Sequence, residues 1–347
     1  MVNIKKILAF SSLALIMTLS LGGITAKADT TNFTVSRITG TNRVITADNL
    51  AKQQFPNGTN DVVLVYGYSY ADAISATPLA KQLNAPILLT SAVGNQPIES
   101  DVLNTIQSLG AKKIHIIGGT GVVSSSIETS LASKYSVERI QGTTDTTRMG
   151  TNAEVAKRVL ANSGQKTGIL VYGFNYPDAL SVAAIASQKG YPVLFADSIS
   201  VNPVVKAVAD GLTIKAVGGD SVLPQSVVNS VNGTKITGNT ANRYDTNIAV
   251  LKYFSENGGI DFNTVYLAKG GSTDLDFADA LVGSAAAANN GSPLVLTGQT
   301  ANPQSVNARN YIIDKNDSAK IIIVGGTGAV GSDVEQLYAP FSIIDIE

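Results

Sequence analysis

Hydrophobic residues occur along this chain in short continuous runs that alternate with longer amphipathic stretches. The short runs, such as residues 62–65, are apolar at every position, as expected of strands that are buried on both faces. The longer stretches place Ala, Ile and Leu three and four residues apart, which predicts helices with one buried face. In the first part of the chain this pattern predicts strands over 62–66, 86–90 and 113–117 and helices over 72–84, 97–109 and 124–133.

The same pattern recurs three times. Asp72, Asp178 and Asp279 occupy one position of the repeat and are 106 and 101 residues apart, so each unit is long enough to form its own core. Alternating strands and helices indicate parallel sheets with right-handed crossovers. We therefore predict an α/β protein of three tandem small modules, each a mostly parallel sheet flanked by helices. The predicted modules span 29–137, 138–234 and 235–347.

Four short motifs appear in the same order in every repeat. The first ends in an arginine three residues before a threonine, and the second has an aromatic residue two positions before the repeated aspartate. The third is a proline that opens an apolar strand, and the fourth is a strand that ends in two glycines. The copies are "RITGTNR", "RIQGTTDTTR" and "KITGNTANR"; "YADAI", "YPDAL" and "FADAL"; "PILLT", "PVLFA" and "PLVLT"; and "IHIIGG", "IKAVGG" and "IIIVGG".

The first 28 residues are typical of a secretory signal peptide, with two lysines, an apolar stretch over 7–21 and a cleavage site of the A-x-A type at Ala26 and Ala28. The chain has no cysteine, and no later segment offers about 18 uninterrupted apolar residues. We expect a secreted protein without a transmembrane or lipid anchor. Without the leader it carries 22 basic and 26 acidic residues, which argues against general binding of nucleic acid or membrane surfaces.

Candidate catalytic groups are few. The single histidine, His115, lies in an apolar run and is expected to pack within a strand. Each repeat offers one acid, whereas glycoside hydrolysis needs a pair. Residues 326–331 match G-x-G-x-x-G, but the other repeats do not, so we expect tight turns there, followed by helices capped by Ser124 and Ser332. We predict no enzyme, no cofactor and no metal site.

Three ordered copies of four motifs behind a leader resemble the cell wall binding repeat 2 family of Gram-positive bacteria. The resemblance covers nearly the whole mature chain. It implies three α/β modules packed around a pseudo-threefold axis and non-covalent binding to an anionic wall polymer. The chain departs from the family plan in two ways: no additional catalytic domain is expected, and the third repeat replaces the Tyr-Gly loop start with "KGGSTDLD", a loop four residues longer.

The repeated arginines are the leading ligand candidates, because a guanidinium forms paired hydrogen bonds with phosphate or carboxylate. The alternative is a salt bridge to the repeated aspartate of the same or the neighbouring module. The lysines nine residues later are expected on a solvated helix face. The arginines are Arg43, Arg148 and Arg243, and the lysines are Lys52, Lys157 and Lys252.

The repeated aspartates and aromatic residues each have two interpretations. An aspartate in a first helical turn can accept backbone N–H bonds and complement the helix dipole, and it can also contact a ligand. The aromatic residues can stack on sugar rings or pack between modules. Tyr70, Tyr176 and Phe277 occur in every repeat, which favours packing. The candidate polymer-binding residues besides the arginines are Asp72, Asp178, Asp279, Tyr68 and Phe174.

These observations favour a secreted, non-catalytic protein that binds an anionic secondary wall glycopolymer through its three repeats. The expected partner is an anionic wall polysaccharide or a teichoic-acid-like polymer, held by several weak sites on one body. The alternative is a soluble envelope protein that encloses a solute or sugar between α/β domains. A threefold repeat fits that alternative poorly, because a hinged cleft needs two lobes. A wall hydrolase comes third.

Overall fold

The computed structural model describes residues 31–273 and 275–339. The predicted signal peptide and the C-terminal tail lie outside the described residues. The described chain forms three sheets of four parallel strands each, and the order of the strands is equivalent in all three. The predicted fold class, three small α/β modules with parallel sheets flanked by helices, is confirmed.

In each sheet, the strand that directly follows a junction helix is one of the two central strands. The first sheet has the order β3 (Ile87–Thr90), β2 (Asp61–Tyr66), β4 (Lys113–Ile117) and β5 (Ser136–Ile140). The second has the order β7 (Val193–Ala196), β6 (Thr167–Tyr172), β8 (Thr213–Val217) and β9 (Thr234–Lys235). The third has the order β11 (Leu294–Thr297), β10 (Thr264–Lys269), β12 (Lys320–Val324) and β1 (Thr34–Ile38).

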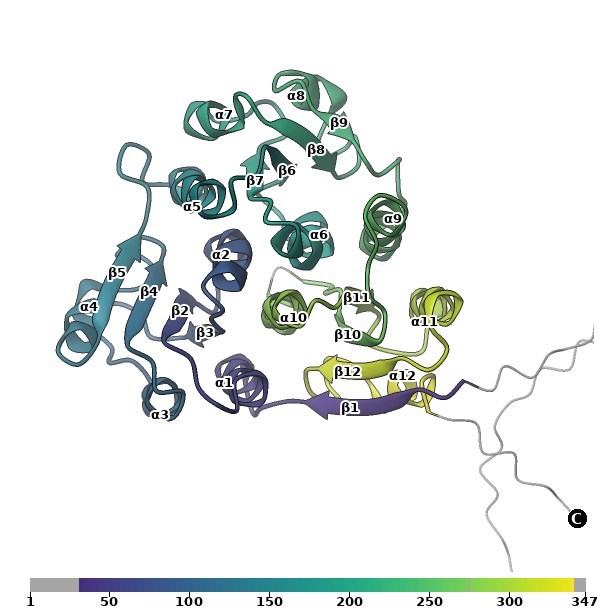
Figure 1. The fold of residues 1–347 in the computed structure, drawn as a ribbon, viewed down its shortest axis with the longest axis horizontal. Helices are drawn as coiled ribbons and strands as arrows, with labels where there is room; N and C mark the ends of the chain where they lie inside the picture. The colour runs from purple at the N-terminus through teal and green to yellow at the C-terminus, as the bar shows by residue number, and fades with distance from the viewer. Residues whose placement is uncertain (1–30, 274, 340–347) are drawn as a thin grey trace, which may run out of the picture. The chain divides into compact units, whose positions relative to one another are not determined.

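The helices fall into three groups by their place around the sheets (Figure 1). The central helices, which pack against one another, are α2 (Tyr70–Gln82), α6 (Pro177–Gln188) and α10 (Ala278–Asn289). The junction helices, which lie between modules, are α1 (Arg43–Gln54), α5 (Arg148–Ser163) and α9 (Arg243–Glu256). The outer helices are α3 (Ser100–Ser108), α4 (Ser125–Ala132), α7 (Pro203–Ala209), α8 (Gln225–Asn229), α11 (Pro303–Lys315) and α12 (Ser332–Gln336).

The repeated aromatic residues meet where the three central helices begin. The ring centroids of Tyr70, Tyr176 and Phe277 are 5.7–5.8 Å apart in every pair, with tilted or edge-to-face geometry. Such pairs stabilise a core beyond the burial of their area. The packing interpretation of these residues is therefore correct. Because the N-termini of the central helices converge, the carboxyl ends of all three sheets lie on the same side of the described unit.

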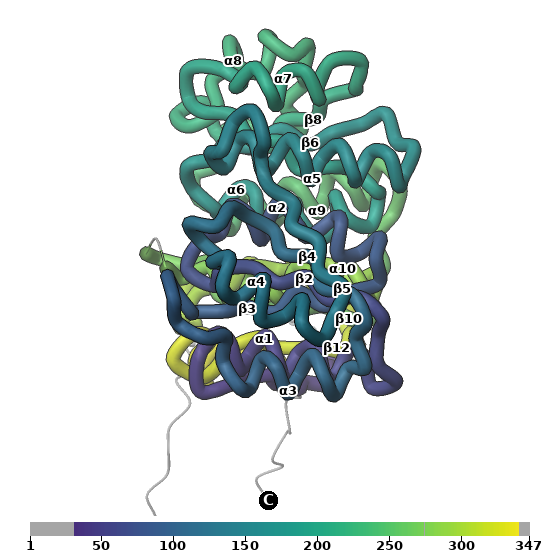
Figure 2. The backbone as a smooth tube through the Cα atoms, turned by 90° about the vertical axis from the view of Figure 1, so that its left-hand side faces the viewer, coloured from purple at the N-terminus to yellow at the C-terminus, as the bar shows by residue number. Residues whose placement is uncertain are grey.

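The strand at the start of each repeat completes the sheet of the repeat before it. β5 joins the first sheet and β9 the second, while β1 pairs with β12 from Thr34↔Lys320 to Ile38↔Val324. In both views the purple start of the described chain lies beside its yellow end (Figure 1 and Figure 2). The ring of three modules is thus closed by strand pairing between the two ends of the chain.

In two of the three repeats the first basic residue holds this added strand in place, whereas in the other Lys235 pairs with Asp220. Arg37 on β1 donates from Nη1 to the carbonyl of Gly325 at 2.8 Å and pairs with Glu335 at 2.8 Å. Arg139 on β5 makes the same two contacts with Gly118 and Glu128. The "R-I" start of the repeat therefore serves the fold.

Candidate functional site

A crevice lies at the carboxyl end of each sheet, where neighbouring strands send the chain to opposite faces. β2 leads into α2 on the inner face, whereas the adjacent β4 leads into α4 on the outer face (Figure 1). Open parallel sheets bind ligands at such switch points. The repeated aspartate lies on one side of this crevice, and the repeated glycine pair lies on the other.

Each aspartate packs directly against the first glycine of the pair. Asp72 is 7% exposed. Gly118 has a φ of +113°, and a Cβ at this position would lie 2.6 Å from an oxygen of the Asp72 carboxylate. The same arrangement places Gly218 beside Asp178 and Gly325 beside Asp279. The glycine pair is thus required both for its backbone conformation and for the room it leaves to the carboxylate.

The aspartates lie in the first turns of the central helices but do not cap them. α2, α6 and α10 have no hydrogen bond from a capping side chain, so this part of the cap prediction is wrong. Ser124 accepts a hydrogen bond from the Ile127 N–H, as predicted for a cap. Ser332 does not, because α12 begins at Ser332 itself and Gly331 occupies the cap position.

Burial raises the pKa of all three aspartates. The pKa is raised to about 6 for Asp72 and Asp178, and it is also raised for Asp279. In each case burial disfavours the ionised carboxylate, and a nearby arginine of the following repeat opposes the effect. These arginines are Arg148 for Asp72, Arg243 for Asp178 and Arg43 for Asp279. A hydrogen bond from Thr246 also opposes it at Asp178.

The repeated arginines are half-buried at the module junctions and bond to main-chain carbonyls. Arg148 donates from Nη1 to the Gly173 carbonyl at 3.1 Å and to the Tyr70 hydroxyl at 2.8 Å. Arg243 repeats this arrangement with the Gly270 carbonyl at 2.9 Å and the Tyr176 hydroxyl at 3.1 Å. No direct ion pair joins these arginines to the repeated aspartates within the described residues.

Arg43 differs because its neighbour Phe277 has no hydroxyl. It donates from Nη1 to the Gly67 carbonyl at 2.8 Å and from Nη2 to the Leu275 carbonyl at 3.2 Å. Its guanidinium also lies 4.1 Å from the centroid of the Tyr68 ring. The three arginines thus connect adjacent modules.

One exposed apolar side chain precedes the central aromatic residue of each repeat by two positions. Tyr68 is 43% exposed, Phe174 is 50% exposed and Leu275 is 52% exposed. Tyr68 and Phe174 also contact the tyrosines that end β2 and β6. Leu275 was missed by the sequence interpretation because the longer third loop shifts it relative to the strand. Counting backwards from Phe277 identifies its position.

At two junctions of the described unit the crevice widens into a cavity. The cavity between the second and third modules has a volume of about 290 Å³ and the one between the third and first modules about 240 Å³. The first is lined by residues that include Tyr172, Asp178, Ser221, Asn242, Arg243 and Thr246. The second is lined by residues that include Asn42, Arg43, Lys269, Asp276, Asp279 and Ala329.

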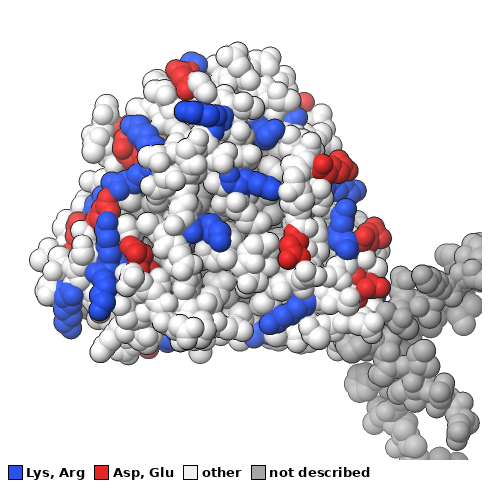
Figure 3. All heavy atoms as spheres, viewed as in Figure 1, with Lys and Arg blue, Asp and Glu red and all other residues white. Residues whose placement is uncertain are grey.

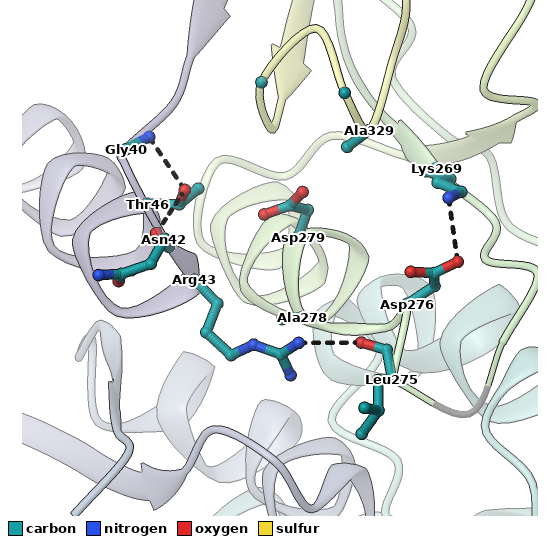
Figure 4. A pocket seen from close by; sticks show the side chains of 12 residues that line it. Gly40, Asn42, Arg43, Thr46, Lys269, Leu275, Asp276, Ala278, Asp279 and Ala329 are labelled. Carbon is teal, nitrogen blue, oxygen red and sulfur yellow. Dashed lines mark hydrogen bonds and ion pairs between the residues drawn. The ribbon is translucent and has the colours of Figure 1, made fainter.

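Figure 4 shows how the cavity between the third and first modules is built. The Asp279 carboxylate points into the space between the start of α1 and the loop at Ala329. Arg43 extends away from that carboxylate toward Leu275. On the opposite wall, Lys269 pairs with Asp276 at 2.9 Å. Each cavity therefore combines a carboxylate from one module with an arginine and a helix start from the next.

The longer loop of the third repeat lies over the central aromatic cluster. The Tyr176 hydroxyl donates to the Thr273 carbonyl at 2.5 Å, and Arg43 donates to the Leu275 carbonyl. Lys269, which pairs with Asp276, occupies the strand-end position of Tyr66 and Tyr172, and Leu275 occupies the position of Tyr68 and Phe174, so no aromatic pair forms here. The crevices are consequently related by symmetry but not identical.

Residues outside the crevices agree with the sequence interpretation. His115 is 3% exposed within β4, and its Nε2 is 2.7 Å from Oδ1 of Asp61. Lys52, Lys157 and Lys252 are exposed. No helix within the described ranges is long and apolar enough to cross a membrane.

The chain is similar to proteins of the bacterial cell wall. It is 34% identical to N-acetylmuramoyl-L-alanine amidase LytC of Bacillus subtilis, over 91% of this chain and 60% of LytC. It is 28% identical to the Amidase enhancer of the same organism, over 87% of this chain and 40% of that protein. The chain therefore spans only part of the length of these relatives.

Solved structures show the same fold. Cwp8 from Clostridium difficile matches with a TM-score of 0.75 and 25% identity, over 89% of this chain and 52% of Cwp8. Cwp6 from the same organism matches with a TM-score of 0.73 and 24% identity, over 90% of this chain and 49% of Cwp6. The family model of cell wall binding domain 2 matches residues 37–128, 139–228 and 236–335. The chain belongs to the cell wall binding domain 2 (CWB2) family.

Proposed function

We propose that this protein is secreted and attaches to the cell wall by binding an anionic secondary wall glycopolymer non-covalently, without catalysis. The observation that carries the proposal is the repetition of one crevice, with the same aspartate, arginine and glycine pair, at three junctions on one side of the described unit. A polymer with a repeating structure can occupy several such sites at once. Weak sites on one body then gain affinity through their effective concentration.

Exposed aromatic rings beside the crevices support contact with sugars. Tyr68 and Phe174 present a flat apolar face with about half of each side chain accessible, and such faces stack on sugar rings. Arg43 and Arg148 lie 4.1 Å and 5.2 Å from the centroids of these rings, which fixes their orientation. The rings are therefore held in place before a ligand arrives.

Charge supports local attraction to a polyanion. On the face in Figure 3, a few basic side chains lie near the middle, and basic and acidic side chains are mixed toward the left and right edges. The formal net charge of the chain is only −1, so the attraction depends on this distribution and not on the total.

The absence of catalysis is supported by the contents of the crevices. The crevice between the second and third modules holds one aspartate, Asp178, whereas glycoside hydrolysis requires a matched pair of acids. In the crevice between the third and first modules the second acid, Asp276, is paired with Lys269, which helps to hold the pKa of its carboxyl at about 2, so it does not serve as a proton donor beside Asp279. His115, the only histidine, lies in the middle of β4, where it pairs with Asp61 at the amino end of β2, and it lines neither of the two cavities. The amidase-related names of two relatives describe proteins of which the chain matches 60% and 40%. We therefore assign no amidase activity to the three modules or to their crevices.

Sedimentation with walls tests the proposal. Purified protein should sediment with native walls and should remain in solution with walls from which acid has removed the secondary polymers. Replacing both Tyr68 and Phe174 by Ala should weaken sedimentation, whereas Val306→Ala, at an exposed apolar position on α11, should leave it unchanged. Equal sedimentation with both wall preparations, or with neither, would contradict the proposal.

A soluble sugar- or solute-binding protein remains the second candidate, and the two cavities favour it. Their volumes of about 240 and 290 Å³ are at the lower end of what small-molecule sites show. A large thermal shift with a free monosaccharide, together with no sedimentation on native walls, would replace the first proposal with this one.

A further inference from the structure

The carboxylates in the crevices have few hydrogen-bond donors from the protein. No side chain or backbone group in the described residues donates to the carboxylate of Asp72 or Asp279. Asp178 receives one hydrogen bond, from Thr246. Asp178 and Asp279 are only partly buried, so their carboxylates reach the cavities, where water or a ligand can donate hydrogen bonds to them. The missing donor at these carboxylates can come from a ligand.

The cation that is nearest to each carboxylate does not supply this donor. In Figure 4, Arg43 turns away from Asp279 and bonds to the carbonyls of Gly67 and Leu275. Arg148 and Arg243 are likewise engaged with carbonyl and hydroxyl oxygens. The aspartate of the cavity wall therefore presents a hydrogen-bond acceptor to a ligand. The arginine remains bonded to carbonyl and hydroxyl oxygens at the junction between modules.

An anionic group is a poor occupant of these cavities. Burial already disfavours a negative charge at Asp178 and Asp279, and a phosphate or carboxylate beside them would add repulsion between like charges. In the cavity between the third and first modules, the only lysine, Lys269, is already paired with Asp276. A hydroxyl or ammonium group would instead be attracted.

From this geometry we propose that the crevices bind hydrogen-bond-donating groups of the wall polymer, sugar hydroxyls or ammonium groups, through Asp178 and Asp279, and that they exclude its anionic groups. This inference rests on the proposed function, because it assigns a part of the same polymer to each crevice. The polymer's phosphates or carboxylates then lie outside the cavities. Recognition of the neutral part of the repeating unit would determine which polymer is selected.

The two cavities are expected to differ in how they hold the rest of the sugar. Tyr172 lines the cavity between the second and third modules, next to the exposed ring of Phe174. An apolar sugar face can pack there while its hydroxyls reach Asp178. In the cavity between the third and first modules, Lys269 replaces that tyrosine and pairs with Asp276, and Leu275 replaces the phenylalanine, so this wall offers polar groups and an aliphatic side chain in place of two rings.

Binding of small probes to the full mature chain tests the inference. Methyl glucoside, methyl N-acetylglucosaminide, glucosamine and inorganic phosphate are each titrated by saturation-transfer NMR into the wild type and into Asp178→Asn, Asp279→Asn and the double variant. Asp210→Asn, at an exposed position that contacts only Lys206, is the matched control. Each single variant should weaken donor-bearing probes about tenfold or abolish one site, and the control should not.

The outcomes separate the sources of the donor. Loss of the methyl glycosides in the variants indicates hydroxyl recognition, and loss of glucosamine alone indicates an ammonium. Both outcomes support the inference. Binding of phosphate that disappears in the Asn variants would overturn it, as would wild-type binding of donor probes that the variants leave unchanged, or no binding of any donor probe to the wild type.

The variants also allow the two proposals to fail separately. Thermal unfolding confirms that each variant folds, and crosslinking of a photoreactive glucoside to the wild type gives a second readout that needs no variant. Labelled peptides should come from residues 219–222 or 326–329, which line the cavities. If the wild type sediments with walls while the glycosides label other regions, the wall proposal survives and the crevice assignment fails.

Discussion

The junction that closes the ring differs from the two junctions that the chain runs through. At the first two, a buried asparagine of the junction helix bonds to the edge strand of its own module and to a serine of the preceding central helix. Asn152 donates to Ser75 Oγ at 2.9 Å and to the Val193 carbonyl at 2.7 Å, and it accepts from the Phe195 N–H at 2.9 Å. Asn247 donates to the main-chain carbonyls of Ser181 at 3.3 Å and Leu294 at 3.1 Å, and it accepts from the Leu296 N–H at 2.9 Å.

At the closing junction both positions are apolar. Ala47 replaces the asparagine and Val282 replaces the serine, and both are buried. An asparagine opposite Val282, or a serine opposite Ala47, would lose a buried partner. At each junction, the junction helix therefore packs better against the central helix that it meets in this structure than against the central helix of another junction. This difference helps to specify the order of the modules around the ring.

Removing the polar junction should have the largest effect. Asn247→Ala leaves a backbone N–H and a carbonyl of β11 buried without their partners, so we expect a loss of about 3–5 kcal/mol in the free energy of unfolding. Guanidinium chloride denaturation measures it. Asn257→Ala, at an exposed side chain just beyond α9, serves as the control, and a loss below 1 kcal/mol at Asn247 would show that the network adds little.

Introducing the polar residue at the apolar junction should cost less. Ala47→Asn places an amide opposite Val282 and should destabilise the protein by about 2–3 kcal/mol. Adding Val282→Ser should recover about 1 kcal/mol, because the serine restores the partner. Additive effects in this double-mutant cycle would contradict the explanation of the junctions.

The strand that closes the ring should be more sensitive than its internal counterpart. Arg37→Ala removes an ion pair and a carbonyl bond from β1, and Arg139→Ala removes the same contacts from β5. We expect each substitution to lower the free energy of unfolding by about 1–2 kcal/mol. Only Arg37→Ala should speed proteolysis at its strand, because β1 is far in the chain from the third sheet that it completes, whereas β5 directly follows the helix that precedes it in its own module. Equal cleavage in both variants would argue against this distinction.

Stability should rise modestly as the pH falls from 8 to 5. Asp48, Asp72 and Asp178 have a pKa raised by burial from 3.8 to about 6, so the folded state binds their protons more tightly than the unfolded state does. Their protonated forms stabilise the fold at low pH, and that stabilisation is lost as the pH rises through 6. The gain should be about 1 kcal/mol per carboxyl.

Thermal unfolding at pH 8, 6.5 and 5 measures the effect, and Asp72→Asn should reduce the slope. Carboxylates with a lowered pKa, such as Asp276 at about 2, do not oppose it in this range. A melting temperature that falls between pH 8 and pH 5 would contradict the role of the buried aspartates.

Local sequence pattern predicts most of the elements and the packing of the repeated aromatic residues. The helix expected from Pro97 begins at Ser100 instead, because the Glu99 carboxylate accepts hydrogen bonds from Ser91 and Thr90 and holds the preceding turn extended. That contact joins two segments outside the helices, and the periodicity of hydrophobic residues in the sequence does not indicate it. Element type follows from local spacing, whereas this boundary depends on a tertiary hydrogen bond.

The candidate site was predicted less completely. The sequence places one aspartate and one arginine in each repeat and leaves an ion pair between neighbouring modules open, but it does not reveal that the two lie near each other across a junction without pairing directly. It also does not indicate that the arginines bond to carbonyls, since backbone acceptors leave no trace in composition. The glycine pairs are the sequence feature that indicates this crevice, because Gly118 must leave room for the carboxylate of Asp72.

The pairing of β1 with β12 has a consequence for the time course of folding. The two strands are separated by nearly the whole chain, so the third sheet has the highest contact order of the three and should form last. A chain that is exported from its N-terminus exposes β1 first and presents β12 only near the end of translocation. Under the proposed secretion, the strand that emerges first pairs with the strand that emerges last, so the third sheet is completed only after export.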